Sequence, residues 1–502
     1  MTHATRQADP DAPAEASAPV QPAKWLAGFG IVVAALLLVW QFSFLDYSRA
    51  LVDLWKISDG GATGFVVYTA AIATLTAAWL WSVWTIRGVA LSQIWLPIAG
   101  ITLLALVAFM IVYPATAIDV YIYAARSHLF SDYGLNPTTV VPQQLWDTDA
   151  YVHYASAEWA DDTSPYGPLW NVIAAPATAL DGNDIESAVL IFKVIMMAGT
   201  AAVGILIYRI GMLIQPQNAV AAMLAWLWSP IVLWEGIANS HNDVLLMLLI
   251  VAAMLCWYRR LDGWVLPLLG AAALLKIVAV MIIPAAAIAI VIRTGWTRRL
   301  LVVAVQSAIL SLGVLWISFV PFYDLQATID AVQEQRGVWV TSPALLIDAM
   351  NREWGWGLDV GQLFDSFSTA MIVLITMVGA AVAYLNPERL PRIAFEQLFW
   401  FLLLATSNVR PWYAIWLIAL AVAIPLGMPF IRAAALSTGM LFSYVYSGWI
   451  QNWSDAEWLE RTALNVTIML GPVLVVTAWS GVRMLRSGRN DPAVTISTPT
   501  AG

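Results

Sequence analysis

Residues 114–170 read PATAIDVYIYAARSHLFSDYGLNPTTVVPQQLWDTDAYVHYASAEWADDTSPYGPLW, the longest stretch of this chain without the composition of a membrane-spanning segment. Apolar runs flank it on both sides. It contains His128 and His153, two of the four histidines. It also holds a dense set of carboxylates: Asp119, Asp132, Asp147, Asp149, Glu158, Asp161 and Asp162. Because chemistry needs polar groups and the rest of the chain has few, a site is first expected here.

The composition is that of a protein with many membrane-spanning helices. Of 502 residues, 61% are hydrophobic and 11% are charged, against about 25% charged in a typical soluble domain. The 27 tryptophans suit rings that lie at membrane–water interfaces. The net charge of −8 argues against a nucleic-acid partner, which needs clustered Lys and Arg. The single cysteine, Cys256, allows no internal disulfide, and we interpret it as an inert core residue.

The apolar runs predict an all-α polytopic membrane protein with 12–14 spans. The proposed spans are 25–45, 64–86, 93–113, 187–209, 217–234, 242–258, 263–275, 277–293, 299–320, 366–385, 393–407, 411–428, 431–450 and 462–485. Three of these runs are short for a hydrocarbon core of about 30 Å, which predicts tilted or re-entrant helices. Residues 1–23 and 486–502 are predicted to be disordered tails that flank a transmembrane domain over 24–485.

The basic residues predict how this domain is oriented. With a cytoplasmic N-terminus, the short inside loops carry most of the Lys and Arg, as the positive-inside rule requires. Both termini are then cytoplasmic in the plasma membrane, and the outside segments are 114–186, 234–242, 321–365, 407–411 and 451–461. We interpret 165–180 as an outward-face helix lying partly in the interface. Since a transporter places polar groups near the midplane, these long, acidic and aromatic outer loops favour an outward-facing enzyme.

Two groups of carboxylates in the first outer loop are candidates for chemistry. Asp119 follows the third span by six residues, in the run IDVYIY over 118–123. A carboxylate held just above the membrane is able to act as a general base on a hydroxyl, and the alternative is an ordinary helix N-cap. Asp161 and Asp162 stand before Pro165. Their oxygens suit a divalent cation, and a solvated turn before a helix is the alternative, so the metal requirement stays open.

The motifs in this region resemble those of a known superfamily. A third span is followed by D-x-Y-x-Y over 119–123, G-x-N-P over 134–137 and S-P-Y-G-P-L-W over 164–170. This order resembles the GT-C superfamily of polyprenyl-phosphate-sugar-dependent glycosyltransferases. It is most similar to the actinobacterial-type α-1,6-mannosyltransferases that use polyprenol-phosphate-mannose. The resemblance covers roughly 93–300 and 410–413, with Thr138 where the family often has Tyr, and with two spans before the usual core.

The resemblance implies a GT-C-type helical bundle and assigns roles within it. In this family the carboxylate of the first large outward loop is the base, and that position matches Asp119. The remaining polar residues of the loop motifs are expected to bind the sugar or the acceptor: Tyr121, Tyr123, Asp161, Asp162 and Tyr166.

A further candidate cluster lies at the junction WEGIANSHND over 234–243. His241, Asn242 and Asp243 are able to bind sugar hydroxyls, and helix capping is the alternative. Lys276 lies in an apolar stretch, where a cation costs about 2.5–3.5 kcal/mol at mid-helix. It is expected to contact a donor phosphate, and snorkelling to the interface is the alternative.

Two arginines of the outer face complete the candidate set. Arg410 precedes Pro411 between two spans, and a guanidinium is able to hold a phosphate through two parallel hydrogen bonds. Trp412 and Tyr413 suit either an interfacial belt or a wall against which a sugar stacks. Arg336, in the second long loop, is a third candidate for the phosphate on a mobile lid.

These features predict an integral-membrane glycosyltransferase. The donor would be a sugar on polyprenyl phosphate, mannose being expected, and the acceptor a glycan or glycolipid on the extracytoplasmic face. Asp119 would be the general base, Arg410 and Lys276 would stabilise the leaving phosphate, and one base without a second nucleophile predicts inversion. The absence of a G-x-x-x-x-G-K-[ST] motif agrees with an already activated donor. A flippase or transporter of lipid-linked saccharides, or a structural membrane protein, is the alternative.

Overall fold

The computed structural model describes residues 23–49, 51–155, 159–322, 324–334 and 340–487. This part of the chain contains α-helices, short 3-10 and π-helical turns and two isolated β-bridges, but no β-strand. The helices are α1 (Ala23–Gln41), α2 (Phe44–Tyr47), α3 (Leu54–Ile57), α4 (Ala62–Thr85), α5 (Leu91–Ile111), α6 (Asp119–Ser131), α7 (Pro168–Ala179), α8 (Ile185–Ile214), α9 (Ala219–Leu227), α10 (Asp243–Tyr258), α11 (Val265–Leu275), α12 (Ile283–Thr294), α13 (Arg298–Phe319), α14 (Leu325–Glu334), α15 (Pro343–Trp354), α16 (Val360–Leu385), α17 (Leu390–Trp400), α18 (Ala414–Val422), α19 (Met428–Val445), α20 (Gln451–Trp453) and α21 (Trp458–Ser487).

Many of these helices are apolar and long enough to cross a membrane. Within the described residues there are seven such segments, or eight if a pair bent by 52° forms one span. They are Ala62–Thr85, Leu91–Ile111, Ile185–Ile214, Ile277–Thr294, Arg298–Phe319, Val360–Leu385 and Trp458–Val482, and the bent pair is Pro216–Leu227 with Val232–Ala238. The predicted class, a polytopic helical membrane protein, is therefore confirmed. The count of fourteen stays a prediction, because several predicted spans are apolar helices of 10–17 residues: Leu26–Gln41, Asp243–Tyr258, Asp262–Leu275 and Pro411–Val422.

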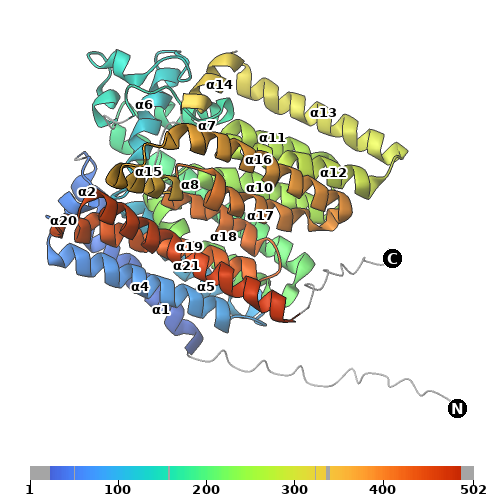
Figure 1. Ribbon diagram of the computed structural model, residues 1–502, viewed down its shortest axis with the longest axis horizontal. Coiled ribbons are helices and arrows are strands. Elements are labelled where there is room, and N and C mark those ends of the chain that lie inside the picture. Colours follow the sequence, from blue (N-terminus) through green and yellow to red (C-terminus); the bar gives the residue numbers. More distant parts are fainter. Residues whose placement is uncertain (1–22, 50, 156–158, 323, 335–339, 488–502) are drawn as a thin grey trace.

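The long helices lie side by side, and several of the short ones lie at one end of the bundle (Figure 1). Helices α2, α6, α15 and α20 are at the left of that view, whereas the turn between α12 and α13 is at the right. Segment 165–180 contains α7, as predicted, and its 12 residues are too few to cross a membrane. Of the predicted tails, 1–23 and 486–502, residues 1–22 and 488–502 lie outside the described part of the chain, whereas Ala23 belongs to α1 and residues 486–487 to α21.

The described residues contain three π-helical turns, two of which lead into a loop and the third into the short helix α20. These turns are Val232–Ala238, Phe401–Ala405 and Tyr446–Ile450. The first follows a break at Pro230, where proline cannot continue the hydrogen bonding of α9. π-helical turns are rare in proteins, and those that occur are often at functional sites. We therefore expect functional residues in the segments that follow these turns, which begin near residues 239, 406 and 451.

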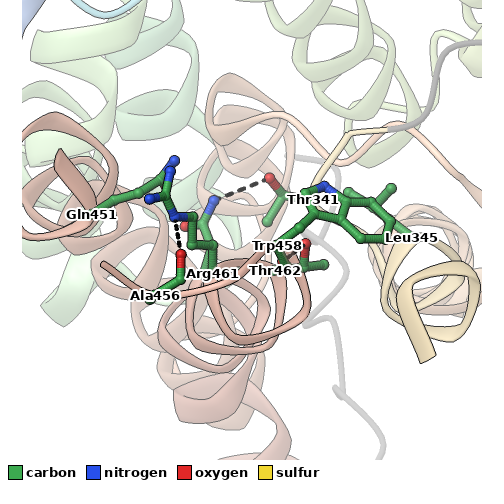
Figure 2. Close-up of a pocket in the computed structure, with 8 residues that line it drawn as sticks. Thr341, Leu345, Gln451, Ala456, Trp458, Arg461 and Thr462 are labelled. Carbon is green, nitrogen blue, oxygen red and sulfur yellow. Dashed lines mark hydrogen bonds between the residues drawn. The ribbon is translucent and has the colours of Figure 1, made fainter. Parts of the chain in front are cut away.

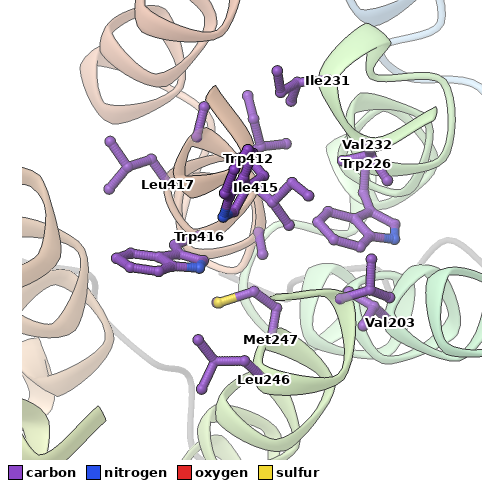
Figure 3. Packing of buried hydrophobic residues seen from close by; sticks show 14 of the residues in the cluster. Val203, Trp226, Ile231, Val232, Leu246, Met247, Trp412, Ile415, Trp416 and Leu417 are labelled. Carbon is purple, nitrogen blue, oxygen red and sulfur yellow. The ribbon is translucent and has the colours of Figure 1, made fainter. Parts of the chain in front are cut away.

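The apolar core lies beneath this end of the bundle and is rich in indole rings. Figure 3 shows Trp226, Trp412 and Trp416 beside Met247 and Val203, side chains from helices that are far apart in sequence. The Trp226 indole nitrogen donates to the carbonyl of Thr200 at 2.8 Å, so its one polar atom is paired inside the core. An aromatic side chain buries about 150–250 Å². Burial of this surface holds the broken helices in place without the help of long loops.

Candidate active site

Asp119 is the first residue of α6, and its carboxylate is 19% exposed. The N-cap position is taken by Ile118 rather than by Asp119, so the capping alternative does not describe this carboxylate. Its Oδ2 atom lies 3.9 Å from Nε2 of His241, which comes from the junction between the bent helix pair and α10. Because 3.9 Å is too long for a hydrogen bond, this arrangement leaves the carboxylate able to accept a proton from another molecule.

His241 is fully buried and held from two sides. Its Nδ1 donates to the backbone carbonyl of Glu235 at 2.9 Å and lies 3.3 Å from a carboxylate oxygen of the same residue. Its ring stacks on Trp412 with centroids 4.0 Å apart. Burial lowers the pKa of His241, but the hydrogen bond to Glu235 and the charges of Glu235, Asp119 and Asp243 raise it above the usual value. The imidazolium form is therefore favoured beside Asp119.

The loop that carries His241 is fixed by a buried polar network. Asn239 donates to Glu235 at 2.8 Å and to the hydroxyl of Thr116 at 2.6 Å. Trp234 donates to the same hydroxyl at 2.8 Å. Lys193 of α8, also buried, donates to the carbonyls of Val112 and Ala238 at 2.7 and 2.5 Å. One lysine thus joins the end of α5, just before the Asp119 loop, to the end of the π-helical turn before His241.

Lys276 lies at the break after α11, where the backbone is extended. Its Nζ contacts both carboxylate oxygens of Asp243, at 2.8 and 2.9 Å, and Trp416 donates to the same carboxylate at 2.5 Å. The ammonium also lies 5.2–5.7 Å from the ring centroids of Tyr166, Tyr413 and Trp416. The cation is therefore paired and enclosed by aromatic rings, as expected of an ionisable group in an apolar region. Contact with a phosphate stays a prediction.

One face of α6 continues the site. Tyr123 and Arg126 follow Asp119 by four and seven residues, so they lie on the same face of the helix. The Tyr123 and Tyr166 hydroxyls share a hydrogen bond of 3.2 Å, and burial together with the Asp119 charge raises the pKa of both phenols. Arg126 is buried, donates to the carbonyls of Trp159 and Asp162 at 3.2 and 3.0 Å, and leaves Nε without a partner among the described residues.

Arg410 begins a single 3-10 turn, Pro411–Tyr413. Its Nε donates to Asn408 at 2.9 Å, and its guanidinium carbon lies 5.5 Å from the Trp412 ring centroid. Trp412 in turn stacks on His241, and Tyr413 stacks on Trp416 with centroids 4.4 Å apart. Residues from four distant segments of the chain are therefore joined into one cluster around Asp119.

Other predicted site residues lie apart from this cluster or outside the described residues. Tyr121 points away, since its hydroxyl donates to the carbonyl of Ser48 at 2.6 Å. Asp161 is exposed, and Asp162 contributes its backbone carbonyl to Arg126. In the described residues no group of three His, Cys, Asp or Glu side chains is placed to hold a metal ion. Arg336 and Glu158 lie outside the residues that the structure describes.

Asn242 shows why capping does not explain the junction. It occupies the N-cap position of α10 but makes no capping hydrogen bond. Both polar atoms of its side-chain amide are buried and have no partner among the described residues. An orphaned buried amide is costly, so it is expected to meet a ligand or water.

The histidines that drew attention to the first outer loop do not enter the cluster. His128 is clamped between Asp149 and Asp132, with nitrogen–oxygen distances of 2.9 and 3.2 Å, and stacks on Tyr151. Burial lowers the pKa of His128, but these carboxylates raise it above the usual value. His153 donates from its ring to the carbonyl of Trp146 at 2.9 Å. These contacts fold the loop.

Sequence reasoning gave no role to Arg126, Glu235 or Lys193. For Arg126 a signal was available, because its spacing of seven residues from Asp119 places both on one helix face. Glu235 and Lys193 act through buried contacts between remote segments, and no local pattern in the sequence indicates such contacts.

The fold and the site define an integral-membrane protein with an enzyme-type polar site at one end of its helix bundle. The sequence model of the family described as "Alpha-(1->6)-mannopyranosyltransferase, N-terminal domain" matches residues 25–293. The chain belongs to this family, and it is a glycosyltransferase. The match begins at the first span and includes Asp119, His241 and Lys276, whereas Arg410 lies beyond it.

Two relatives show how far the likeness extends. Alpha-(1->6)-mannopyranosyltransferase A of Mycobacterium tuberculosis is 24% identical over 393 residues, which cover 70% of this chain and 71% of that protein. Alpha-(1->6)-mannopyranosyltransferase A of Corynebacterium glutamicum is 26% identical over 173 residues, and the match covers 34% of each chain. The predicted resemblance to the actinobacterial-type mannosyltransferases is confirmed, and the enzyme reading is favoured over the flippase alternative.

Proposed function

We propose that this protein transfers mannose from a polyprenyl-phosphate-linked donor to a glycan or glycolipid acceptor at the extracytoplasmic face, with inversion and with Asp119 as the general base. The observation that carries the proposal is the position of the Asp119 carboxylate. It lies beside His241, which Glu235 and Trp412 hold in place, and it shares its end of the bundle with Lys276 and Arg410.

The reaction is a single displacement at the anomeric carbon. The oxygen of an acceptor hydroxyl forms a bond to that carbon as the bond from carbon to the phosphate oxygen breaks. The hydroxyl proton passes to Asp119, and polyprenyl phosphate leaves with the electron pair. Nε2 of His241 lies 3.9 Å from a carboxylate oxygen of Asp119. The imidazolium therefore offsets the negative charge of the carboxylate, but it is too far away to form a hydrogen bond with the oxygen that takes the proton.

The departing phosphate needs cations, and Lys276 and Arg410 are the two that we propose for it. Lys276 is fixed by Asp243 and by a cage of rings, so its charge is placed before the donor binds. Arg410 adds a planar guanidinium beside Trp412. Positive groups that are already oriented stabilise developing negative charge without reorganisation, which is the larger part of many enzymatic rate enhancements. The aromatic walls Tyr413 and Trp412 are suited to exclude water from the sugar.

The layout of the chain supports the side of the membrane that we propose. Helices α10 and α11 run in opposite directions, since Asp243 at the start of α10 contacts Lys276 just after the end of α11. The fourteen predicted crossings would put both termini on one side of the membrane and the Asp119 cluster on the other. Most Lys and Arg fall in the loops on the side of the termini, which the positive-inside rule assigns to the cytoplasm.

A transfer assay with purified protein tests the function. Wild-type protein in lipid nanodiscs receives radiolabelled polyprenyl-phosphate-mannose and a short α-1,6-mannoside, and we expect an elongated mannoside of opposite anomeric configuration at the new bond. Asp119→Asn should abolish transfer while donor binding is kept, and Asp147→Asn, at an exposed position in the same loop, should transfer normally. Full activity of Asp119→Asn would exclude this residue as the base. No turnover by wild type with any polyprenyl-phosphate sugar would overturn the proposed donor.

A further inference from the structure

A pocket lies outside the Asp119 cluster, between the start of α15, Gln451 and the first turns of α21. Its volume is about 450 Å³, which is within the range of small-molecule sites. Figure 2 shows Gln451 and Arg461 on one side and Thr341, Leu345 and Trp458 on the other. The family match ends at residue 293, so every one of these residues belongs to the part of the chain beyond it.

We propose that this pocket binds the non-reacting part of the acceptor, a neutral oligosaccharide, and so extends the proposed transferase site. This inference rests on the proposed function. The pocket combines an indole with amide, hydroxyl and guanidinium groups, which suits a sugar. Amides and guanidinium groups pair with hydroxyls, while the apolar face of a sugar ring packs on an aromatic ring.

The polar groups of the pocket are fixed and partly unused. Arg461 donates from Nε to the carbonyl of Ala456 at 2.6 Å and from Nη2 to that of Ser454 at 3.4 Å, which takes two of its five N–H donors. Asn465 donates to the hydroxyl of Thr341 at 3.3 Å. Its side-chain carbonyl oxygen is buried without a partner among the described residues. A buried acceptor in this state is suited to a ligand hydroxyl.

Trp458 supplies a platform with a set orientation. The ring is 45% exposed, and the guanidinium carbon of Arg352 lies 5.2 Å from its centroid. Arg352 is in turn paired with Asp348 at 2.8 Å, one turn earlier on α15. An exposed indole held in this way loses little conformational freedom when a sugar stacks on it.

The backbone beside the pocket is strained and connects it to Arg410. Thr341 has a φ of +26°, which a β-branched residue rarely adopts. Its neighbour Val340 forms a bridge with the loop before Arg410, donating to the carbonyl of Ser407 and accepting from Val409, both at 3.1 Å. The π-helical turn Tyr446–Ile450 immediately precedes Gln451. Strained turns and π-helical turns concentrate at functional sites, and this bridge joins the pocket wall to the wall of the Asp119 cluster.

The local charge favours a neutral ligand over an anionic one. The segment SDAEWLER over 454–461 contains three exposed carboxylates, Asp455, Glu457 and Glu460, and a single cation, Arg461. A phosphate or another anion would be repelled by this excess of negative charge, whereas sugar hydroxyls would not.

Acceptors of different length separate this proposal from the proposed function. With radiolabelled polyprenyl-phosphate-mannose as the donor, Trp458→Ala and Gln451→Ala should each raise KM for α-1,6-mannohexaose about tenfold, the size expected for one lost stacking or hydrogen-bond contact. KM for a methyl mannoside and for the donor should be unchanged. Trp354→Ala, at an exposed tryptophan on α15 outside the pocket, is the matched control and should match wild type for every substrate.

The outcomes are distinct. If wild type is active and the pocket variants keep the wild-type KM for the hexaose, the pocket proposal is overturned. It is also overturned if KM rises equally for the hexaose and the methyl mannoside. An inactive wild type points to the proposed function instead, and the pocket is then tested by titrating mannohexaose against Trp458 fluorescence-difference spectra of wild type and Trp458→Ala. Absence of binding there, or displacement by inorganic phosphate, also overturns the pocket proposal.

Discussion

Two carboxylates at opposite ends of α10 have opposite surroundings. Near the start of α10, Asp119 is 19% exposed and its nearest charged contact is the imidazole of His241 at 3.9 Å. Four residues after the end of α10, Asp262 is fully buried, and it pairs with Arg293 and with Arg299, the latter at 3.0 Å. The first carboxylate is left open to another molecule. The second is saturated by its own chain.

This difference separates a site from a structural clamp. A buried charge whose partners are all internal cannot accept a proton from a substrate without losing those pairs. The clamp holds α10, α12 and α13 together through short turns, and Glu388 extends it by pairing with Arg260 at 2.6 Å. At the other end, broken helices and a π-helical turn bring polar side chains together, and the carboxylate of Asp119 stays partly exposed.

Exchanging each aspartate for asparagine tests the comparison most strongly. Asp119→Asn should lower kcat/KM for transfer by about 10³-fold with an unchanged melting temperature, since general base catalysis contributes about 10²–10⁴-fold. Asp262→Asn should keep kcat but lose about 3 kcal/mol of stability, because Arg293 is left buried without its partner. Thermal unfolding and initial rates measured on the same preparations check both. The reverse pattern, in which Asp262→Asn loses activity and Asp119→Asn loses stability, would show that the site lies at the Asp262 end of the bundle and the clamp at the Asp119 end.

Lys276 pairs with the buried carboxylate of Asp243 and is also proposed to contact the donor phosphate, so its removal should affect both stability and activity. Lys276→Met should lower the transfer rate about 10²-fold, as the loss of one preorganised charge does. It should also cost about 3 kcal/mol, because Asp243 remains buried without its ion pair. In the double variant Asp243→Asn with Lys276→Met, the stability should recover and the activity should not. Recovery of transfer in the double variant would mean that the pair is structural only.

The sequence predicted the helical class, which the structure confirms. Asp119, Lys276 and Arg410 were predicted because a polar residue next to an apolar span is conspicuous, and the structure connects all three through side-chain contacts, while their roles stay predictions. The sequence could not predict that Lys276 pairs with Asp243, because 33 residues separate them and the contact depends on how α10 and α11 pack. Short-range patterns carry no such information.

The roles of the histidines show the same limit. His128 and His153 lie in the stretch richest in carboxylates, and their contacts fold that loop. His241, in the polar junction between the bent helix pair and α10, lies beside Asp119. Local crowding of titratable groups therefore points to the loop that carries Asp119, but the histidines of that loop pair with its own carboxylates, since a dense loop satisfies its own charges first.

The raised pKa of His241 predicts a pH effect on stability. The folded protein favours the imidazolium, so its pairing contributes stability that is fully present below the unfolded pKa of about 6.5 and is lost as the pH rises through the higher folded value. His241→Gln should remove this dependence and lower transfer about 10²-fold, because Asp119 loses its positioned neighbour. Melting temperatures of wild type and variant across pH 6–9 check this, with His153→Gln as the control. Parallel pH curves for wild type and His241→Gln would mean that His241 is neutral.

Arg410→Lys should give the smallest effect of the four predictions, because lysine keeps the positive charge and loses only the planar geometry of the guanidinium. Arg410→Lys should raise KM for the polyprenyl-phosphate donor about tenfold with little change in kcat, since the fork of two parallel hydrogen bonds to phosphate is lost. Arg299→Lys, at the opposite end, should transfer at the wild-type rate, because that half-exposed guanidinium pairs with the chain's own Asp262. Equal donor KM values for Arg410→Lys and wild type would show that charge alone is needed at position 410. The guanidinium would then serve mainly to hold the loop through Asn408, and the leaving phosphate would depend on Lys276.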